Sequence, residues 1–454
     1  MAEGGQGMGQ DASRAELVGF RDALRGCLTR WGDALFELAD AALDGPSAVG
    51  SVPSLSLEPV FRRSHGSLYK ALARGRIDAE RLRGLLAAAR PADWPPVFAV
   101  DASTWPRCDA ETSPERGFYY SASRHSAGQP IVAGWSYQWV AGLSWAADSW
   151  TAPLDARRIP PRTDTVAATI DQVRELVGRL GDAGSVPLFV FDAGYDPIAL
   201  GHGLADTRAG ILVRIRSDRL FYADPVRSPA GSVGRPRRHG RRLGCADPAS
   251  WWAPDAVLTA RDPCYGRVEV RAWHGLHPRL HGRGRWAGAP PPIVRGSVIR
   301  VAVEHLPKPT ARAVKTLWLW WSGPGSPDLD VCWRAYLRRF DLEHTFRFVK
   351  GALGWTAPAL RTPEQADRWT WLVVAAYTQL RLARGLVADD RLPWERPCDP
   401  ARLTPTRVRR GFRRLRAAIG TPASPPKYRK AGPGRPKGTR RPPRTRYPTL
   451  KKAA

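Results

Sequence analysis

Two aspartates follow apolar runs of the kind that form buried strands, and their carboxylates could hold a metal ion. Asp101 follows the run VFAV and Asp192 follows LFVF. Each run has the composition of a strand buried on both faces. If the two strands are neighbours in one sheet, the carboxylates meet at one edge, where their oxygens would suit Mg²⁺ or Mn²⁺. Asp also commonly ends a strand as a turn residue, and this simpler interpretation stays open.

A third carboxylate, Glu343, lies in a segment with the pattern of one long helix, expected over residues 328–351. Tyr336, Arg339, Glu343 and Lys350 are offset by 0, 3, 7 and 14 residues. At roughly 100° per residue, they fall within about 60° of one another on the helix wheel. One stripe would therefore carry a phenol, two cations and a carboxylate. The alternative is a solvated face in which Arg339 and Glu343 form an ion pair.

Together these motifs resemble the DDE transposases of bacterial insertion sequences, in the group with the signature Y-(2)-R-(3)-E-(6)-K. The signature runs here as YLRRFDLEHTFRFVK, from Tyr336 to Lys350. The family's first acid follows a strand, as in VFAVDAST, and its second lies in a turn such as FDAGYD. The three motifs occur in the family's order, and the resemblance covers about residues 60–385.

The resemblance implies an RNase H-like mixed sheet, with the third acid separated from the second by a largely β insertion. It implies that Asp101, Asp192 and Glu343 are catalytic and bind two Mg²⁺ ions, for which Mn²⁺ could substitute. Such ions activate the attacking oxygen and neutralise phosphate charge. The implied reaction is cleavage at transposon ends and strand transfer into target DNA. The implied partners are terminal inverted repeats, target DNA and a second copy of the chain on DNA.

Further residues are expected to contact DNA. Arg339 and Lys350 can hold phosphates near Glu343, and Tyr336 belongs to the same stripe. In the family, a Trp before the signature helix stacks on a base flipped out of the transposon end. Trp318 in the segment TLWLWWS matches that position. The alternative is that Trp318 belongs to the core.

The charge distribution predicts a polyanionic partner. The 454-residue chain has a formal net charge of +28, and residues 401–454 contain 18 Lys or Arg and no Asp or Glu. Release of counterions would then favour DNA binding. The motif GPGRPKG, which contains Arg435 and Lys437, resembles an AT-hook, with a plain basic linker as the equal alternative. The alternative interpretation is that the basic tail only increases the solubility of the protein.

The remaining patterns predict an α/β fold, a mixed sheet with helices on its faces, plus an N-terminal helical domain. Residues 11–44 have helical periodicity, and two short helical runs hinged near Gly75 form either a helix-turn-helix module or a structural cap. Strands are expected at 130–144, 144–150, 210–216 and 316–322, and helices after a cap at Thr163 or Asp164 and at 369–386. The expected domains are N-terminal helical and DNA-binding (1–92), catalytic core (93–216), insertion (217–315), second part of the core (316–390) and basic, partly disordered tail (391–454).

Several other classes of protein are not favoured. The six cysteines have no CxxC spacing, which argues against a zinc knuckle or a disulfide framework. His274, His277 and His281 are separated by Pro278 and glycines, so no metal-presenting helix is expected there. Without a signal peptide or a membrane-spanning run, we expect a bacterial cytoplasmic protein associated with the nucleoid. Two rival functions remain, a catalytically silent DNA-binding remnant and an RNase H-like nuclease that does not join strands.

Overall fold

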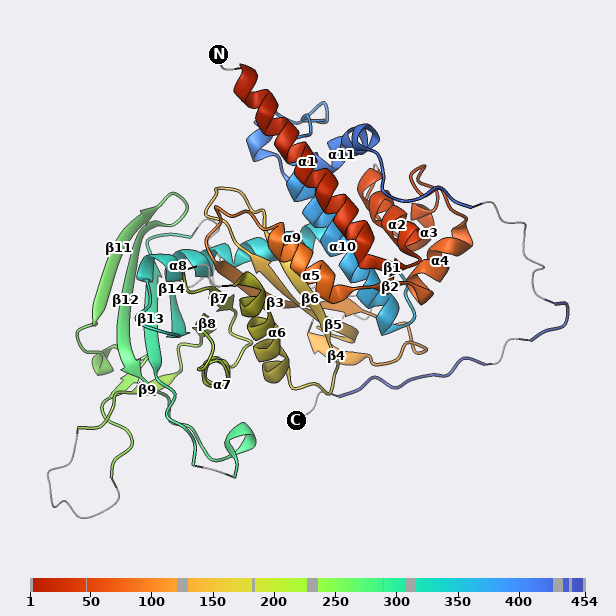
Figure 1. The fold of residues 1–454 in the computed structure, drawn as a ribbon. Helices are drawn as coiled ribbons and strands as arrows, with labels where there is room; N and C mark the ends of the chain where they lie inside the picture. The colour runs from red at the N-terminus through yellow and green to blue at the C-terminus, as the bar shows by residue number, and fades with distance from the viewer. Residues whose placement is uncertain are drawn as a thin grey trace. The chain divides into compact units, whose positions relative to one another are not determined.

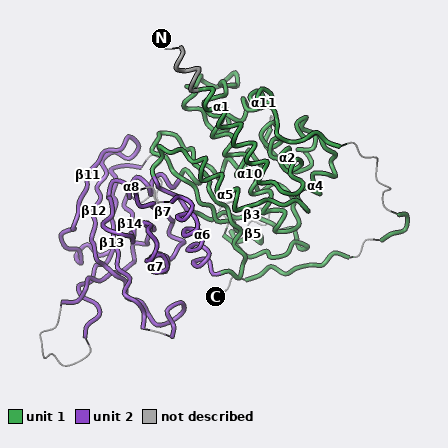
Figure 2. The backbone as a smooth tube through the Cα atoms, in the orientation of Figure 1, with its two compact units in different colours: residues 1–95, 101–163, 341–454 green, residues 96–100, 164–340 purple. Residues whose placement is uncertain are grey.

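The computed structural model describes residues 3–45, 47–120, 130–181, 184–226, 236–288, 290–306, 315–427, 436–440 and 443–451. The chain divides into two compact units, which Figure 2 colours separately. The first unit comprises residues 1–95, 101–163 and 341–454, and the second comprises residues 96–100 and 164–340. Strand β3 (Val97–Pro106) therefore contributes residues to both units.

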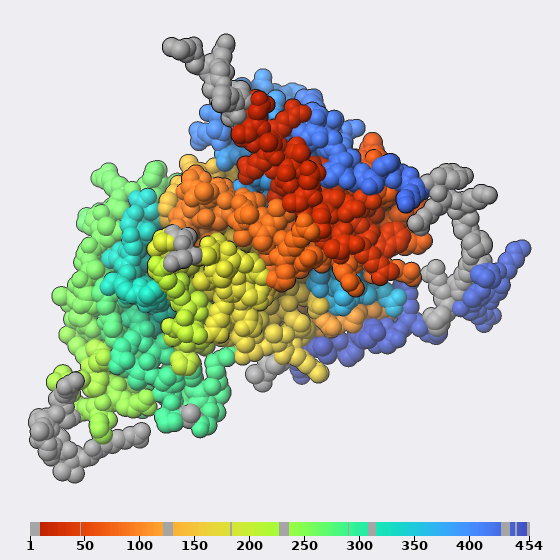
Figure 3. Space-filling view, viewed as in Figure 1, coloured from red at the N-terminus to blue at the C-terminus, as the bar shows by residue number. Residues whose placement is uncertain are grey.

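The first unit is built around α10 (Pro363–Ala383), a helix buried over most of its length. Thr362 and Gln365 form a capping box at its start, which explains why the helix begins there. Helices α1, α2 and α11 pack against it, and Figure 3 shows the red N-terminal helices in contact with blue segments from the C-terminal part of the chain. The other helices of this unit are α1 (Glu3–Cys27), α2 (Gly32–Asp44), α3 (Val52–Leu55), α4 (His65–Arg74), α5 (Ala79–Ala88), α9 (Phe340–Gly351) and α11 (Pro405–Ile419).

The strands of the first unit surround an aromatic core. Strand β5 (Ile131–Gly142) pairs antiparallel with β4 (Gly117–Tyr120) and β6 (Ala152–Ile159). The rings of Trp105 and Trp139 both pack against the ring of Trp355, at centroid distances of 6.3 and 4.9 Å. The predicted strand at 130–144 is confirmed. The strand expected at 144–150 is wrong, because those residues form a connection before β6.

The second unit contains a mixed sheet with the order β11-β12-β13-β14-β8-β7-β3 (Figure 1). The pairings of β3 with β7 and of β7 with β8 are parallel, whereas the others are antiparallel. The strands are β7 (Leu188–Phe191), β8 (Gly210–Ile215), β11 (Ala256–Asp262), β12 (Gly266–Leu276), β13 (Gly296–Val303) and β14 (Thr316–Ser322), with a separate pair, β9 (Leu220–Tyr222) and β10 (Arg242–Gly244). Residues 217–315, expected as an insertion, thus supply strands that extend the sheet beyond β14.

Three helices accompany this sheet: α6 (Thr165–Leu180), α7 (Pro197–Gly203) and α8 (Leu329–Arg338). The predicted cap of the first is confirmed, because the Asp164 side chain accepts hydrogen bonds from the backbone of Val166 and Ala167. Asp196 caps α7 in the same way. Helix α7 packs on β8, and α8 packs on β7 and β12. None of the described helices is long and apolar enough to cross a membrane.

Two helices expected to be continuous are broken. Residues 11–44 divide into α1 and α2 because Trp31 adopts a left-handed conformation (φ 58°) after the short strand β1 (Leu28–Arg30). Residues 328–351 divide into α8 and α9 at Arg339, whose backbone stays right-handed (φ −52°, ψ −32°). Hydrophobic periodicity continues through both breaks, so it gave no sign of them.

Both ends of the chain pack onto other parts of the first unit. The N-terminal helices do not form a compact unit of their own, since α1 and α2 pack against α10. Part of the tail is bound to the first unit: the backbone N–H groups of Tyr447 and Leu450 donate to the carbonyl oxygens of Glu111 and Arg116 at 2.8 and 2.7 Å. Pairing with backbone near β4 orders residues 443–451 despite their polar composition.

Candidate active site

Asp101 and Asp192 follow strand segments that pair in parallel within the second unit. The pairing of β3 with β7 runs as far as Ala99 and Val190, and each aspartate comes two residues later. The apolar residues before each acid are buried, as predicted from VFAV and LFVF. Strand β3 continues beyond Asp101 to Pro106, so only Asp192 ends its strand.

Each aspartate is partly buried and is oriented by its own backbone. An Asp101 carboxylate oxygen accepts a hydrogen bond from the N–H of Ala102 at 2.8 Å. An Asp192 oxygen accepts from the N–H of Gly194, also at 2.8 Å, which is the hydrogen bond of an Asx-turn. A Cβ at Gly194 would lie 3.1 Å from the same oxygen, so the turn keeps the carboxylate close to the backbone.

Asp101 and Lys350 of helix α9 influence each other within the first unit. Burial lowers the pKa of Lys350 below its ordinary value of 10.5, and the negative charge of Asp101 opposes that shift. The ammonium group also lies 5.7 Å from the ring centroid of Trp355. Glu343, on the same helix, is exposed. The first unit thus brings Asp101 near the helix that carries Glu343.

Helix α9 is held on its other side by buried hydroxyl groups that sequence patterns did not reveal. The hydroxyl oxygens of Thr345 and Thr151 are 2.8 Å apart, and the hydroxyl of Tyr377 lies 3.4 Å from that of Thr345. The Thr345 hydroxyl also donates to the carbonyl of Asp341 at 3.1 Å. Three elements distant in sequence contribute to this network, so no local motif could have identified it. It fixes the turn of helix that carries Glu343.

Tyr336 and Arg339 lie in the second unit and are buried. Tyr336 is 2% exposed and Arg339 is 5% exposed, whereas Glu343 is exposed. The Arg339 guanidinium carbon lies 5.9 Å from the ring of Tyr336 and 5.0 Å from that of Phe340. The Tyr336 hydroxyl has no hydrogen-bond partner among the described residues. The expected stripe is therefore divided: two members are covered, while Glu343 and Lys350 belong to the first unit.

The other expected DNA-binding residues also differ in exposure. Trp318 is 4% exposed and packs against Trp273 and Trp251, with ring centroids 6.0 and 5.4 Å away, which favours the core interpretation. Lys437 is exposed, and Arg435 lies outside the described residues.

No ready-made metal cluster is found in the part of the chain that the structure describes: no three His, Cys, Asp or Glu side chains are grouped to hold an ion. The histidines are engaged otherwise. His274 bonds Ser297 at 2.8 Å, and the buried His277 bonds His239 at 3.0 Å. Desolvation lowers the pKa of both His277 and His239, which favours their neutral forms.

Comparison with known proteins gives one family. The family model described as DDE superfamily endonuclease matches residues 23–279. The match contains Asp101 and Asp192 and ends before Glu343. No curated protein matches the sequence.

Proposed function

Because the chain belongs to the DDE superfamily endonuclease family, we propose that it is a transposase that cleaves DNA at transposon ends and joins the freed ends to target DNA. The proposed catalytic residues are Asp101, Asp192 and Glu343, on an RNase H-like sheet and in the group with the Y-(2)-R-(3)-E-(6)-K signature. The register of β3 and β7 carries the proposal: both aspartates follow the Ala99–Val190 pair by two residues. Neighbouring parallel strands keep residues of equal register close.

The proposed cofactor is Mg²⁺, with Mn²⁺ as a substitute and two ions at the site. The residues fit such ions chemically, because all the ligands would be carboxylates and none is fully buried. When bound, a pair of divalent cations supplies an activated attacking oxygen and stabilises the charge on the leaving oxygen. The Asx-turn at Asp192 would hold the carboxylate of this residue in a fixed direction, and the hydroxyl network around Thr345 would hold the turn of α9 from which Glu343 extends.

The proposed DNA contacts differ in how directly they could form. Lys437 is exposed, so it can bind a phosphate without rearrangement, and Arg435 is proposed to act beside it. Lys350 is only partly exposed, and it is proposed to bind a phosphate next to Glu343. Tyr336, Arg339 and Trp318 would have to become exposed first. A homodimer bridging two transposon ends, with the protein associated with the nucleoid, completes the proposal.

The test is the substitution Asp192→Asn, which removes a carboxylate charge and keeps the side-chain shape. A plasmid carrying the DNA that flanks the gene is incubated with Mg²⁺, and nicking and joining are measured beside DNA binding. Cleavage should be abolished, whereas binding should persist because it depends on Lys and Arg. Asp196→Asn is the matched control: it lies in the same FDAGYD turn and Asn caps a helix as well as Asp does, so it should cleave normally.

The same assay decides between the proposal and its rivals. Full cleavage by Asp192→Asn would overturn the catalytic assignment. Cleavage by the wild-type protein without joined products would identify a nuclease that lacks strand transfer. Binding without cleavage, across Mg²⁺ and Mn²⁺, would identify a silent DNA-binding remnant.

A further inference from the structure

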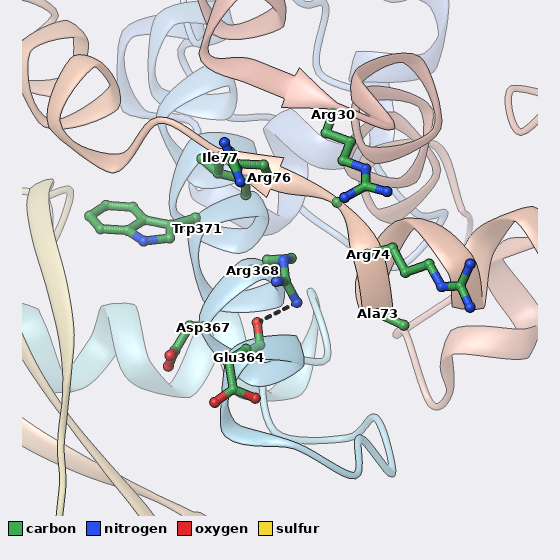
Figure 4. A pocket seen from close by; sticks show the side chains of 10 residues that line it. Arg30, Ala73, Arg74, Arg76, Ile77, Glu364, Asp367, Arg368 and Trp371 are labelled. Atoms are coloured by element: carbon green, nitrogen blue, oxygen red, sulfur yellow. Dashed lines mark hydrogen bonds between the residues drawn. The ribbon is translucent and has the colours of Figure 1, made fainter.

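A cavity of about 610 Å³ in the first unit is lined by arginines from three parts of the sequence (Figure 4). Arg30 comes from β1, Arg74 from the last turn of α4, Arg76 from β2 (Arg76–Ile77) and Arg368 from α10. We call these four side chains and the space between them the arginine pocket. It is open to solvent on the side of the first three, whose side chains are all exposed.

Within the described residues, none of the Arg30, Arg74 and Arg76 side chains has an ion-pair partner. This differs from arginines nearby: Arg83 pairs with Asp155 at 2.8 Å, and Arg62 pairs with Glu37 at 2.7 Å. A guanidinium has five donors that fit phosphate oxygens, so three unpaired ones around a cavity form a receptor for an anion.

The backbone holds two of these charges in an unfavourable arrangement. Strands β1 and β2 pair antiparallel, with a register shift after Leu28 that makes Arg30 the Cα partner of Arg76, and like charges on paired positions destabilise a strand pair. Gly75 lets the chain pass close to α4 and β1, because a Cβ there would lie 2.3 Å from the carbonyl oxygen of Ala71 and 3.3 Å from that of Arg30. A bound anion would turn the repulsion into attraction.

On the α10 side of the pocket, the charged side chains of Arg368 and Asp367 already have hydrogen-bond partners within the protein. The Arg368 guanidinium donates to the carbonyls of Leu72 and Glu364 at 2.8 and 3.1 Å, which ties α10 to α4. Asp367 accepts hydrogen bonds from Tyr137 at 2.7 Å and Arg158 at 3.1 Å, so its charge is compensated away from the cavity. Glu364 is the remaining carboxylate, and the lining as a whole stays positive.

We propose that the arginine pocket binds the phosphodiester backbone of DNA through Arg30, Arg74 and Arg76. The inference rests on the proposed function for the identity of the anion, and it adds a contact far in sequence from Asp101, Asp192 and Glu343. It also assigns a role to the helix pair hinged at Gly75: the turn between α4 and α5 presents phosphate ligands rather than acting only as a cap. Contacts of this kind position DNA and carry no sequence preference.

The test compares the wild-type protein with the double variant Arg30→Gln/Arg76→Gln in binding to a fluorescent random-sequence duplex at several salt concentrations. Loss of two phosphate contacts should make the slope of log affinity against log salt shallower by about 1.8. Between about 50 and 200 mM salt, the wild-type affinity should then fall about 12-fold further than that of the variant. The control Arg413→Gln/Arg414→Gln removes the same charge from exposed positions of α11.

Two further measurements make the result decisive. The melting temperature of Arg76→Gln should equal or exceed that of the wild-type protein, because the substitution relieves repulsion with Arg30. Inorganic phosphate, tested alone, should compete only weakly if the pocket recognises a DNA backbone; full competition at low concentration would instead identify a free anion site and overturn the proposal.

An unchanged salt slope in the double variant, or an equal change in the α11 control, would also overturn it. Cleavage is not used in these measurements. If the wild-type protein binds DNA through the pocket but does not cleave it, only the catalytic proposal is refuted.

Discussion

Replacing Trp318 by alanine distinguishes a core side chain from a platform for a flipped base. The ring is 4% exposed and packs between Trp251 and Trp273. Truncating a Trp in such a cluster lowers the free energy of unfolding by about 3–5 kcal/mol, because apolar surface is lost and a cavity remains. For a unit of this size, the melting temperature should fall by about 6–20 °C.

Calorimetry on matched variants measures this effect. Trp320→Ala truncates a fully buried ring on the same strand and should be equally damaging. Trp394→Ala is the opposite control: the Trp394 side chain is 79% exposed, so its removal should change the free energy of unfolding by no more than about 0.5 kcal/mol. In parallel, 2-aminopurine at the terminal bases of a cleaved duplex reports unstacking. The core interpretation is refuted by two results together: Trp318→Ala has the same melting temperature as Trp394→Ala, and it abolishes the rise in 2-aminopurine fluorescence that the wild-type protein produces.

Three further predictions concern α9. Asp101→Asn should lower the pKa of Lys350 further, because the negative charge of Asp101 opposes the lowering caused by burial. An NMR titration of the lysine side chain would measure this shift. An unchanged pKa of Lys350 would contradict the electrostatic coupling. The pKa of Lys350 in the folded protein lies below its ordinary value of 10.5, so between these two pH values the unfolded chain binds more protons than the folded one. The free energy of unfolding should therefore rise with pH across that window. Lys350→Met should remove this rise, which unfolding measurements at several pH values would show. Thr345→Val should lower the free energy of unfolding by about 1–3 kcal/mol, because it removes the hydroxyl that lies 2.8 Å from that of Thr151 and 3.4 Å from that of Tyr377. Thr345→Ser keeps a hydroxyl at this position and should retain both stability and cleavage; equal stability of the Val and Ser variants would contradict the role of the network.

Sequence patterns predicted the features that neighbours along the chain decide. The runs before Asp101 and Asp192 are apolar enough to be buried whatever surrounds them, and both are buried strands. The Asp164 cap depends only on the first turn of α6, and it is present as predicted. Local signals therefore placed Asp101 and Asp192 directly after buried strand residues, whereas the common register of the two strands became visible only in the structure.

Features decided by tertiary contacts could not be predicted in this way. The helix wheel placed Tyr336, Arg339, Glu343 and Lys350 on one stripe, but it could not show which part of the chain covers each residue. The structure buries the first two in the second unit and leaves Glu343 exposed. The arginine pocket was missed for the same reason: β1 and β2 are too short for periodicity to detect, and only their pairing brings Arg30 and Arg76 together.

The net charge of the chain is a poor guide to where DNA binds. Much of the basic charge after residue 400 is used inside the first unit rather than presented to a ligand. Arg416 pairs with Asp44 at 2.7 Å, Arg410 pairs with Glu395 at 2.7 Å, and Arg409 donates to the carbonyl of Ala42 at 3.0 Å. Such arginines release no counterions when DNA binds, so the salt dependence should be weaker than the composition suggests. Unpaired arginines held in place by the fold are stronger candidates for phosphate contacts than a high count of basic residues, and this reasoning favours the arginine pocket over α11.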